Sequence, residues 1–243
     1  MPEKEIYLSI VIPAYNEEKR IHKILDSIVA YLETTKLEIE TVIAIDASPD
    51  DTLRVAESYK AKISNLVIID GKVNRGKGGA VQEGFKVAKG KYIIFADADN
   101  STPIEQIDKL LPYIEKYDVV IGSRYCKGGK LVIPQSFVRR AGGRALNIVI
   151  QALAVSGIRD TQCGFKLFSA KAAKEIFERL TIFNFSFDIE VLAIAKHLGY
   201  KVKEVGIIWY DDPHSTVSPI RDGLRMVRNA WTIRKNIIKG RYR

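Results

Sequence analysis

Two aspartates, Asp97 and Asp99, have the type and spacing that most clearly suggest chemistry, because they directly follow the apolar run of residues 93–96. That run shows no alternation, which predicts a strand buried on both faces, as in a parallel sheet. Ligands of open α/β sheets bind at the carboxyl ends of the strands, so both acids are expected in a site. A divalent cation shared with a substrate phosphate would relieve their mutual repulsion. A solvated turn that caps the next helix is the alternative.

Two further segments with residues that could bind a ligand follow predicted strands. Asp46 follows the apolar residues 39–45, and the glycine-rich residues 74–80 follow the predicted strand at 66–69 and open a helix. Backbone amides at such a helix start can bind phosphate. The segment is neither a Walker loop nor a dinucleotide GxGxxG motif after the first strand. Two interpretations of the segment remain open: it contacts an anion, or it is a flexible turn that carries cations.

Between Arg124 and Arg144 the sequence carries basic residues and no acid. Its first half contains Gly128, Gly129 and Pro134, and is expected to be a loop after a strand at residues 118–122. Because this loop begins at the same sheet edge as the two aspartates, phosphate binding is favoured over a merely solvated basic face. Aromatic residues are not interleaved and no nucleic-acid motif occurs, which argues against a nucleic-acid partner.

These residues must be positioned by strands and helices that alternate along the chain. Four such units precede Asp99, with short connections, which predicts an α/β fold with a mostly parallel sheet and helices on both faces. No linker or repeat divides residues 1–219, so one domain is expected there. The chain of 243 residues, 47% of them hydrophobic, is long enough to bury a full core.

Charge and cysteine content narrow the function classes. The formal net charge of +9 predicts an anionic partner, either nucleic acid, nucleotide phosphate or an anionic membrane surface. Cys126 and Cys163 form no close pair, which argues against a zinc site and a disulfide framework. The sequence shows no stretch apolar enough to span a bilayer and no signal peptide, so we expect a cytoplasmic location.

Residues 220–243 are predicted to form a basic amphipathic helix. Its apolar face is expected to hold Ile220, Leu224, Val227, Trp231 and Ile238. Basic residues crowd the remaining surface, and Asp222 is the single acid. This composition suits the surface of an anionic membrane. A terminal helix packed on the domain with a solvated basic side is the alternative.

Several segments taken together resemble the inverting GT-A-fold glycosyltransferases of family 2. Within that family the chain is most similar to the dolichyl-phosphate glucosyl- and mannosyltransferases. The resemblance rests on five segments in the family's order: residues 9–18 (SIVIPAYNEE), 74–81 (NRGKGGAV), 95–99 (FADAD), 121–124 (IGSR) and 160–168 (DTQCGFKLF). It implies a Rossmann-like domain that transfers glucose from UDP-glucose, or mannose from GDP-mannose, to a polyprenyl phosphate lipid for glycan biosynthesis. Such an enzyme would be peripheral on the inner, cytoplasmic face of a membrane.

The resemblance also implies roles for individual positions. The nucleotide pocket would comprise Pro13, Ala14, Tyr15, Glu17, Asp46, Lys77 and Asp97. Mg²⁺ or Mn²⁺ would be held by Asp99 with Asp97 and Ser101. Arg124 and one of Arg139 or Arg140 would contact the acceptor phosphate. In this scheme the metal and nearby cations stabilise the negative charge that develops on the departing diphosphate.

The acceptor decides whether a general base is needed. A lipid phosphate is already ionised at neutral pH, so the arginines need only position it. A hydroxyl on a lipid-linked glycan would need a base, for which Asp188 is the first candidate and Glu190 the second. Both acids fall in the first turn of a predicted helix, where complementing the helix dipole is their ordinary role.

Two departures from the family pattern leave questions open. Asp46-Ala47-Ser48 stands where the family usually has Asp-Asp-Gly-Ser, which leaves uridine versus guanosine and glucose versus mannose undecided. The transmembrane helices of some relatives do not occur in this sequence, so membrane access would come from the basic tail, from a partner protein or from helices of a longer chain. A binding module without catalysis, recognising nucleotide or anionic lipid, is the alternative from another class, although the intact Asp97, Asp99 and Arg124 favour an enzyme.

Overall fold

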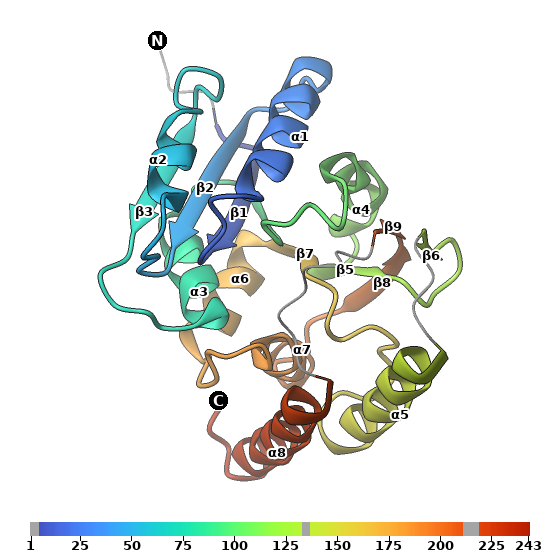
Figure 1. The fold of residues 1–243 in the computed structure, drawn as a ribbon. Coiled ribbons are helices and arrows are strands. Elements are labelled where there is room, and N and C mark those ends of the chain that lie inside the picture. The colour runs from blue at the N-terminus through green and yellow to red at the C-terminus, as the bar shows by residue number, and fades with distance from the viewer. Residues whose placement is uncertain (1–4, 133–136, 211–218) are drawn as a thin grey trace.

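The computed structural model describes residues 5–132, 137–210 and 219–243, apart from the side chains of residues 137–141, 219 and 220 (Figure 1). The strands are β1 Leu8–Ala14, β2 Ile39–Ile45, β3 Leu66–Asp70, β4 Tyr92–Ala96, β5 Val119–Ser123, β6 Lys130–Leu131, β7 Phe165–Ser169, β8 Val202–Gly206 and β9 Ile208–Trp209. The helices are α1 Ile21–Thr34, α2 Thr52–Glu57, α3 Lys77–Val87, α4 Ile107–Ile114, α5 Phe137–Leu153, α6 Ala170–Glu178, α7 Phe187–His197 and α8 Pro219–Ile238, with a 3-10 turn η1 Ile104–Gln106 before α4.

The main sheet has seven strands in the order β3-β2-β1-β4-β7-β5-β8. Strands β1 to β4 are parallel to one another, as the alternation of strands and helices predicted. The exception is β7, which runs antiparallel to both β4 and β5. Because Phe165 at the start of β7 pairs with Ala96 at the end of β4, the loop before β7 reaches the carboxyl ends of the parallel strands.

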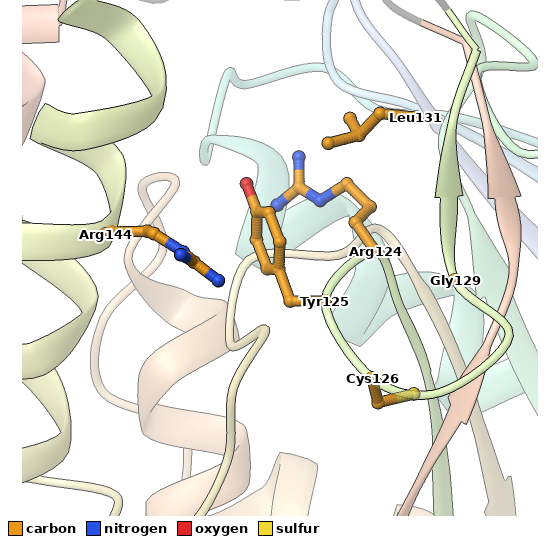
Figure 2. A pocket seen from close by; sticks show the side chains of 6 residues that line it. All are labelled: Arg124, Tyr125, Cys126, Gly129, Leu131 and Arg144. Carbon is orange, nitrogen blue, oxygen red and sulfur yellow. The ribbon is translucent and has the colours of Figure 1, made fainter. Parts of the chain in front are cut away.

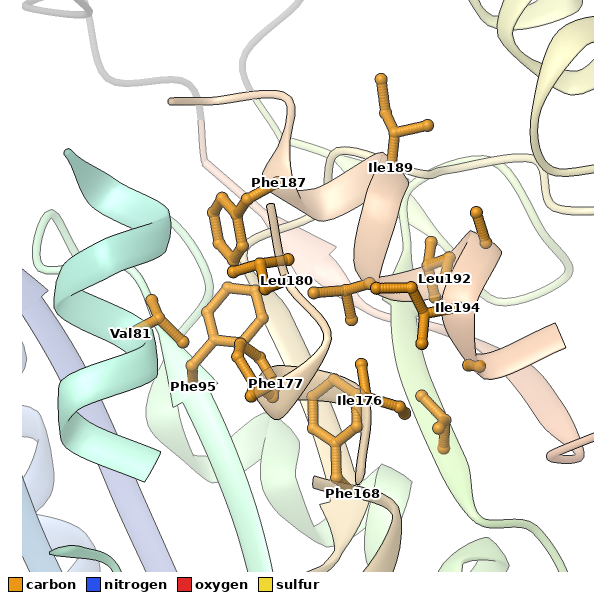
Figure 3. Packing of buried hydrophobic residues seen from close by; sticks show 14 of the residues in the cluster. Val81, Phe95, Phe168, Ile176, Phe177, Leu180, Phe187, Ile189, Leu192 and Ile194 are labelled. Atoms are coloured by element: carbon orange, nitrogen blue, oxygen red, sulfur yellow. The ribbon is translucent and has the colours of Figure 1, made fainter. Parts of the chain in front are cut away.

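The sheet separates two hydrophobic layers. Along β1, Ile10 and Ile12 face the layer under α1, α2 and α4, whereas Val11 faces the layer under α3, α6 and α7. This alternation follows from the two-residue period of a strand, and both faces are apolar because helices cover both. Figure 3 shows the second layer, in which Phe95 and Phe168 from the sheet meet Phe177 and Phe187 from the helical side.

The segment predicted as one last strand, residues 202–209, divides between two sheets. Strand β8 pairs with β5, while β9 pairs with β6 in a separate two-stranded sheet. Gly206 lies at the crossing point, where a Cβ atom would come within 2.3 Å of the Gly129 backbone nitrogen. Only glycine permits this close approach of the end of β8 to the loop at residues 127–129.

Helix α8 confirms the predicted C-terminal helix, although the helix ends at Ile238 instead of continuing to residue 243. It packs on the domain through Met226, Ala230 and Ile233, which are buried. The apolar face predicted from the sequence is not the face that packs on the domain, since Leu224 is 70% and Ile238 74% exposed. Helix α8 therefore has two apolar faces, and the domain covers one of them.

No helix in the described ranges is both long and apolar enough to cross a membrane.

Candidate active site

A cavity of ≈ 780 Å³ opens at the carboxyl ends of the parallel strands. Eleven of the predicted site residues line it: Pro13, Ala14, Tyr15, Glu17, Asp46, Lys77, Asp97, Asp99, Ser101, Arg124 and Asp188. The fold thus brings together residues from both halves of the chain, as expected from the topology of an open α/β sheet. The side chains of Arg139 and Arg140 lie outside the described residues.

Acidic side chains gather at one end of the cavity. Lys77 at the start of α3 forms an ion pair with Asp97, with 2.6 Å between Nζ and Oδ1. Asp99 accepts a hydrogen bond at 2.9 Å from the Ser101 amide. Burial, reinforced by the charge of Asp97, raises the pKa of Asp99, and burial likewise raises the pKa of Glu17. Arg20, which forms an ion pair with Glu17 at 2.7 Å, is the second cation at this end, and the carboxylates of Glu17, Asp46, Asp97 and Asp99 outnumber the two cations.

These acids fit a divalent cation that completes its coordination with substrate oxygens. In the described part of the chain, no group of three or more His, Cys, Asp or Glu side chains is arranged to hold an ion alone. Mg²⁺ commonly takes only one or two carboxylates and fills its remaining positions with water and phosphate oxygens. Asp99, with a raised pKa and no ion-pair partner among the described residues, provides such a carboxylate.

Side chains of the β2–α2 turn hold the neighbouring β1–α1 turn in place. Ser48 Oγ accepts a hydrogen bond from the Asn16 amide at 2.7 Å, and Thr52 Oγ1 accepts one from the Glu17 amide at 2.9 Å. Asn16 and Ala47 adopt left-handed φ values of 55° and 52°. For alanine this conformation costs about 1 to 2 kcal/mol, so the surrounding contacts must impose it.

Asp46 has a positioning role that its sequence context did not reveal. Its carboxylate accepts hydrogen bonds from the Arg75 amide at 2.7 Å and the Gly76 amide at 2.8 Å. These bonds tie the glycine-rich segment to the end of β2, and Gly76 takes a φ of +81° there. Asp46 therefore fixes the start of α3, and with it the position of Lys77.

Arg124 at the other end of the cavity is bound by a buried acid. Its Nε and Nη2 atoms each lie 2.7 Å from the carboxylate of Asp160, which also accepts the Arg124 amide at 2.9 Å. Although burial opposes ionisation, the guanidinium outweighs it and lowers the pKa of Asp160. The Arg124 guanidinium carbon lies 5.0 Å from the centroid of the Trp209 ring. Asp160 and Trp209 together fix Arg124 in one orientation.

Arg144 is a site residue that sequence reasoning missed, although it belongs to the basic stretch noted above. It lines a second cavity of ≈ 290 Å³ together with Arg124, Tyr125, Cys126, Gly129 and Leu131. Figure 2 shows its side chain extending from α5 toward Tyr125. No acid lines this cavity, and Arg144 has no ion pair among the described side chains. The cavity is therefore suited to an anion.

The two predicted base candidates differ in their surroundings. Asp188 lines the main cavity and is 3% exposed, and Lys166, which is fully buried, forms an ion pair with it. Burial raises the pKa of Asp188 in spite of the opposing charges of Lys166 and Lys77.

Glu190 does not line the cavity. It is fully buried and accepts hydrogen bonds from the Ile182 amide at 2.6 Å and the Tyr242 hydroxyl at 2.6 Å, and from Thr181. Its carboxylate thereby fastens the chain after α8 to the start of α7. The sequence placed Asp188 and Glu190 together because they are two residues apart, but successive helix positions face different directions.

Comparison with known proteins connects this site with a family. The sequence signature described as Glycosyl transferase family 2 matches residues 9–177. A dolichyl-phosphate beta-glucosyltransferase of Dictyostelium discoideum is 36% identical over 252 residues, covering 98% of this chain and 77% of that protein. The proteins of that name from Saccharomyces cerevisiae and Homo sapiens are 34% and 32% identical, and the matches cover 99% and 97% of this chain and 78% and 77% of those proteins.

Solved structures agree on the fold. Mannosyl-3-phosphoglycerate synthase from Rubrobacter xylanophilus superimposes with a TM-score of 0.69 at 19% identity, over 97% of this chain and 75% of that one. Glucosyl-3-phosphoglycerate synthase from Mycobacterium tuberculosis, solved with Mn²⁺ and UDP, gives a TM-score of 0.64 at 19% identity, over 97% of this chain and 79% of that one. The fold is thus that of GT-A enzymes, and the chain belongs to glycosyl transferase family 2.

Proposed function

We propose that this protein is a glycosyltransferase that moves glucose from a nucleotide sugar, with inversion, to the phosphate of a polyprenyl lipid such as dolichyl phosphate. The observation that carries the proposal is the main cavity, which is lined at one end by Asp97, Asp99 and Lys77 and at the other by Arg124. A donor diphosphate with a cation suits the acidic end, and an anionic acceptor suits the basic end. The named relatives act on dolichyl phosphate and glucose, which supports the same pairing here.

The residues of the acidic end would hold the donor. Asp99, with Asp97 and Ser101, would bind Mg²⁺ or Mn²⁺, which supplies positive charge to the departing diphosphate when bound. Lys77 adds a second positive charge beside the same group, because Asp97 holds its ammonium at this end of the cavity. Pro13, Ala14 and Tyr15 would form the wall against the nucleotide.

The basic end would orient the acceptor. Arg124 retains Nη1 for a ligand while its other nitrogens bind Asp160, and Arg144 lines the adjoining cavity. Arg139 and Arg140 remain proposed contacts of the same phosphate. A phosphate monoester is anionic at neutral pH, so these arginines need to position it and not to deprotonate it.

The environment of Asp188 favours a phosphate acceptor over a hydroxyl acceptor. A general base for a hydroxyl must be free to accept a proton within hydrogen-bond reach. The Oδ1 atom of Asp188 instead forms an ion pair with the buried Lys166, whose ammonium also donates to the Cys163 carbonyl at 2.6 Å. Transfer to a hydroxyl of a lipid-linked glycan, with Asp188 as base, is the second candidate.

Membrane binding would follow from the outer faces of α5 and α8, which pack against each other. Ile148 on α5 is 67% exposed, and Leu224 and Trp231 on α8 are 70% and 50% exposed. Arginines and lysines flank these apolar side chains on α8. Such a surface suits the interface of an anionic bilayer, where the acceptor resides. We therefore propose a peripheral protein on the cytoplasmic face of a membrane.

Calorimetric titration with UDP-glucose and GDP-mannose, each with Mn²⁺ or with a chelator, tests the donor half of the proposal. We expect UDP-glucose to bind, and binding to weaken strongly when the metal is chelated. Binding of GDP-mannose alone would reassign the transferred sugar. Binding of neither donor would refute the proposed activity and favour a module that recognises anionic lipid.

A further inference from the structure

Two buried side-chain amides in the main cavity lack a hydrogen-bond partner. The Nε2 atom of Gln162 and the Oδ1 atom of Asn147 are both enclosed, and neither has a partner among the described residues. Both side chains line the ≈ 780 Å³ cavity. Buried polar groups are nearly always paired, and an unpaired one is costly, so these two atoms point to a ligand.

The side chain of Asn147 and the backbone on both sides of Gln162 are held in place by their neighbours. The Asn147 amide nitrogen donates to the Arg159 carbonyl, which leaves Oδ1 as its free end. Gln162 lies in a loop that is anchored on both sides. Before it, Asp160 binds Arg124; after it, the Gly164 carbonyl accepts the Asp97 amide at 3.1 Å. Gln162 therefore lies between the acidic end and the basic end of the cavity.

The free atoms differ in what they can bind. The enclosed end of Gln162 is a donor, whereas the enclosed end of Asn147 is an acceptor. A phosphate oxygen would satisfy Gln162 and repel the Asn147 oxygen, because an ionised phosphate group brings only acceptors. A hydroxyl group can satisfy either amide. Water can satisfy the same atoms, and a sugar hydroxyl that displaces it would keep the hydrogen bonds.

We propose that Gln162 and Asn147 bind hydroxyl groups of the transferred hexose and thereby determine which sugar is accepted. The proposal rests on the proposed function, in which the hexose lies between the nucleotide diphosphate and the acceptor phosphate. That is where the loop from Asp160 to Gly164 places Gln162. Neutral amides suit this task, because they discriminate the position of a hydroxyl without adding charge beside the breaking bond.

The test compares UDP with UDP-glucose as ligands of the full chain in the presence of Mn²⁺. Gln162→Met and Asn147→Leu remove the free amide ends while keeping approximate size. We expect each variant to bind UDP as tightly as the unaltered protein but to bind UDP-glucose about five- to tenfold more weakly. Gln151→Met is the matched control, since Gln151 lies on α5 and does not line the cavity. It should change neither affinity.

Unaltered UDP binding also shows that each variant is folded. Equal weakening of UDP and UDP-glucose would overturn the inference, because the amides would then serve the nucleotide. Unchanged UDP-glucose affinity in both variants would overturn it as well. Discrimination between sugars gives a second readout. UDP-galactose differs from UDP-glucose at one hydroxyl, and the difference in affinity between the two should be smaller in at least one variant than in the unaltered protein.

Failure of the proposed function is distinguishable from failure of this inference. If the unaltered protein binds GDP-mannose instead, the same variants are titrated with GDP and GDP-mannose, and the same contrast is expected. If the unaltered protein binds no nucleotide sugar, the function and the inference both fall. If it binds one and the variants behave as it does, only the inference falls.

Discussion

Arg124 and Arg144 approach the same small cavity, but they are bound very differently (Figure 2). Arg124 forms a buried pair with Asp160, and breaking such a pair by removing one partner costs about 3 to 5 kcal/mol. Loss of activity in an Arg124 variant would therefore mix lost stability with lost acceptor binding. Arg144 is exposed and has no ion pair among the described side chains, so it separates the two effects.

We predict that Arg144→Gln raises the KM for polyprenyl phosphate about tenfold and leaves the melting temperature unchanged. The physical reason is the loss of one charge-assisted hydrogen bond, worth about 1.5 kcal/mol, to the acceptor phosphate. Initial rates at varied acceptor concentration give the KM. Arg54→Gln, a change at an exposed arginine of α2 that lines neither cavity, is the control for net charge. An unchanged KM in Arg144→Gln would remove this residue from the acceptor site.

The two cysteines should react very differently with thiol reagents. Burial raises the pKa of Cys163 to about 12, whereas Cys126 is partly exposed. At pH 8 roughly one Cys163 in ten thousand would be a thiolate, and the side chain is also enclosed. We predict that a disulfide reagent labels one thiol per native chain at pH 8 and two after denaturation. Rapid labelling of two thiols in the native protein would contradict the packing around Cys163.

At the scale of elements, helices α5 and α8 line the main cavity on one side and carry exposed apolar residues on the other. Leu146 and Met226 face the cavity, whereas Ile148 and Leu224 are exposed. A helix that is apolar on two faces is unusual for an isolated soluble domain, because the second face needs a partner. A bilayer would cover that face and bring its lipids to the cavity.

We predict that Leu224→Gln with Trp231→Gln strongly reduces sedimentation with vesicles rich in anionic lipid. Binding of the unaltered protein should also weaken as the salt concentration is raised from about 0.05 to about 0.5 M. Over this range the Debye length falls from roughly 14 Å to roughly 4 Å, which screens the electrostatic part of the attraction. Val87→Gln, at an exposed apolar position of α3, controls for lost hydrophobic surface. Equal vesicle binding by the double variant and the unaltered protein would show that α8 is not the docking element.

The sequence predicted those elements whose signals are local. The apolar runs and the acids that follow them predicted β2, β4 and the sheet edge at which the cavity opens. The helical spacing of apolar residues predicted α8. Strand direction was not predictable for β7, because it depends on pairing with β4 and β5 across the chain. The role of Asp160 was missed for the same reason, since its partner Arg124 lies 36 positions earlier.

Other features depend on what a side chain meets in three dimensions. The exposed and buried faces of α8 could not be told apart, because both are apolar and helical spacing does not say which one packs. Glu190 is a candidate base by its place in the sequence, but in the structure its carboxylate accepts a hydrogen bond from the Tyr242 hydroxyl. The unpaired ends of Gln162 and Asn147 have no sequence signal, because a missing hydrogen bond is visible only when the neighbours are placed.

At the scale of the whole molecule, acids and arginines lie at different ends of one main cavity in a chain of net charge +9. The parallel strands bring acids to one end of the cavity, and the strand β5 and helix α5 bring arginines to the other. In the proposed function this polarity would order the two substrates. The donor with its cation would lie at the sheet, and the anionic acceptor would approach from the side of α5 and α8. The same arrangement is our reason for proposing a phosphate as the nucleophile.

The most direct measurement is product formation from labelled UDP-glucose with two acceptors, polyprenyl phosphate and a lipid-linked glycan that offers sugar hydroxyls, in detergent with Mn²⁺. We predict glucose-labelled lipid with the phosphate only, because Arg124 and Arg144 can hold an anion and Asp188 is paired with Lys166. Labelled product from the lipid-linked glycan, at a rate comparable to that from the phosphate, would contradict this mechanism and favour transfer to a hydroxyl.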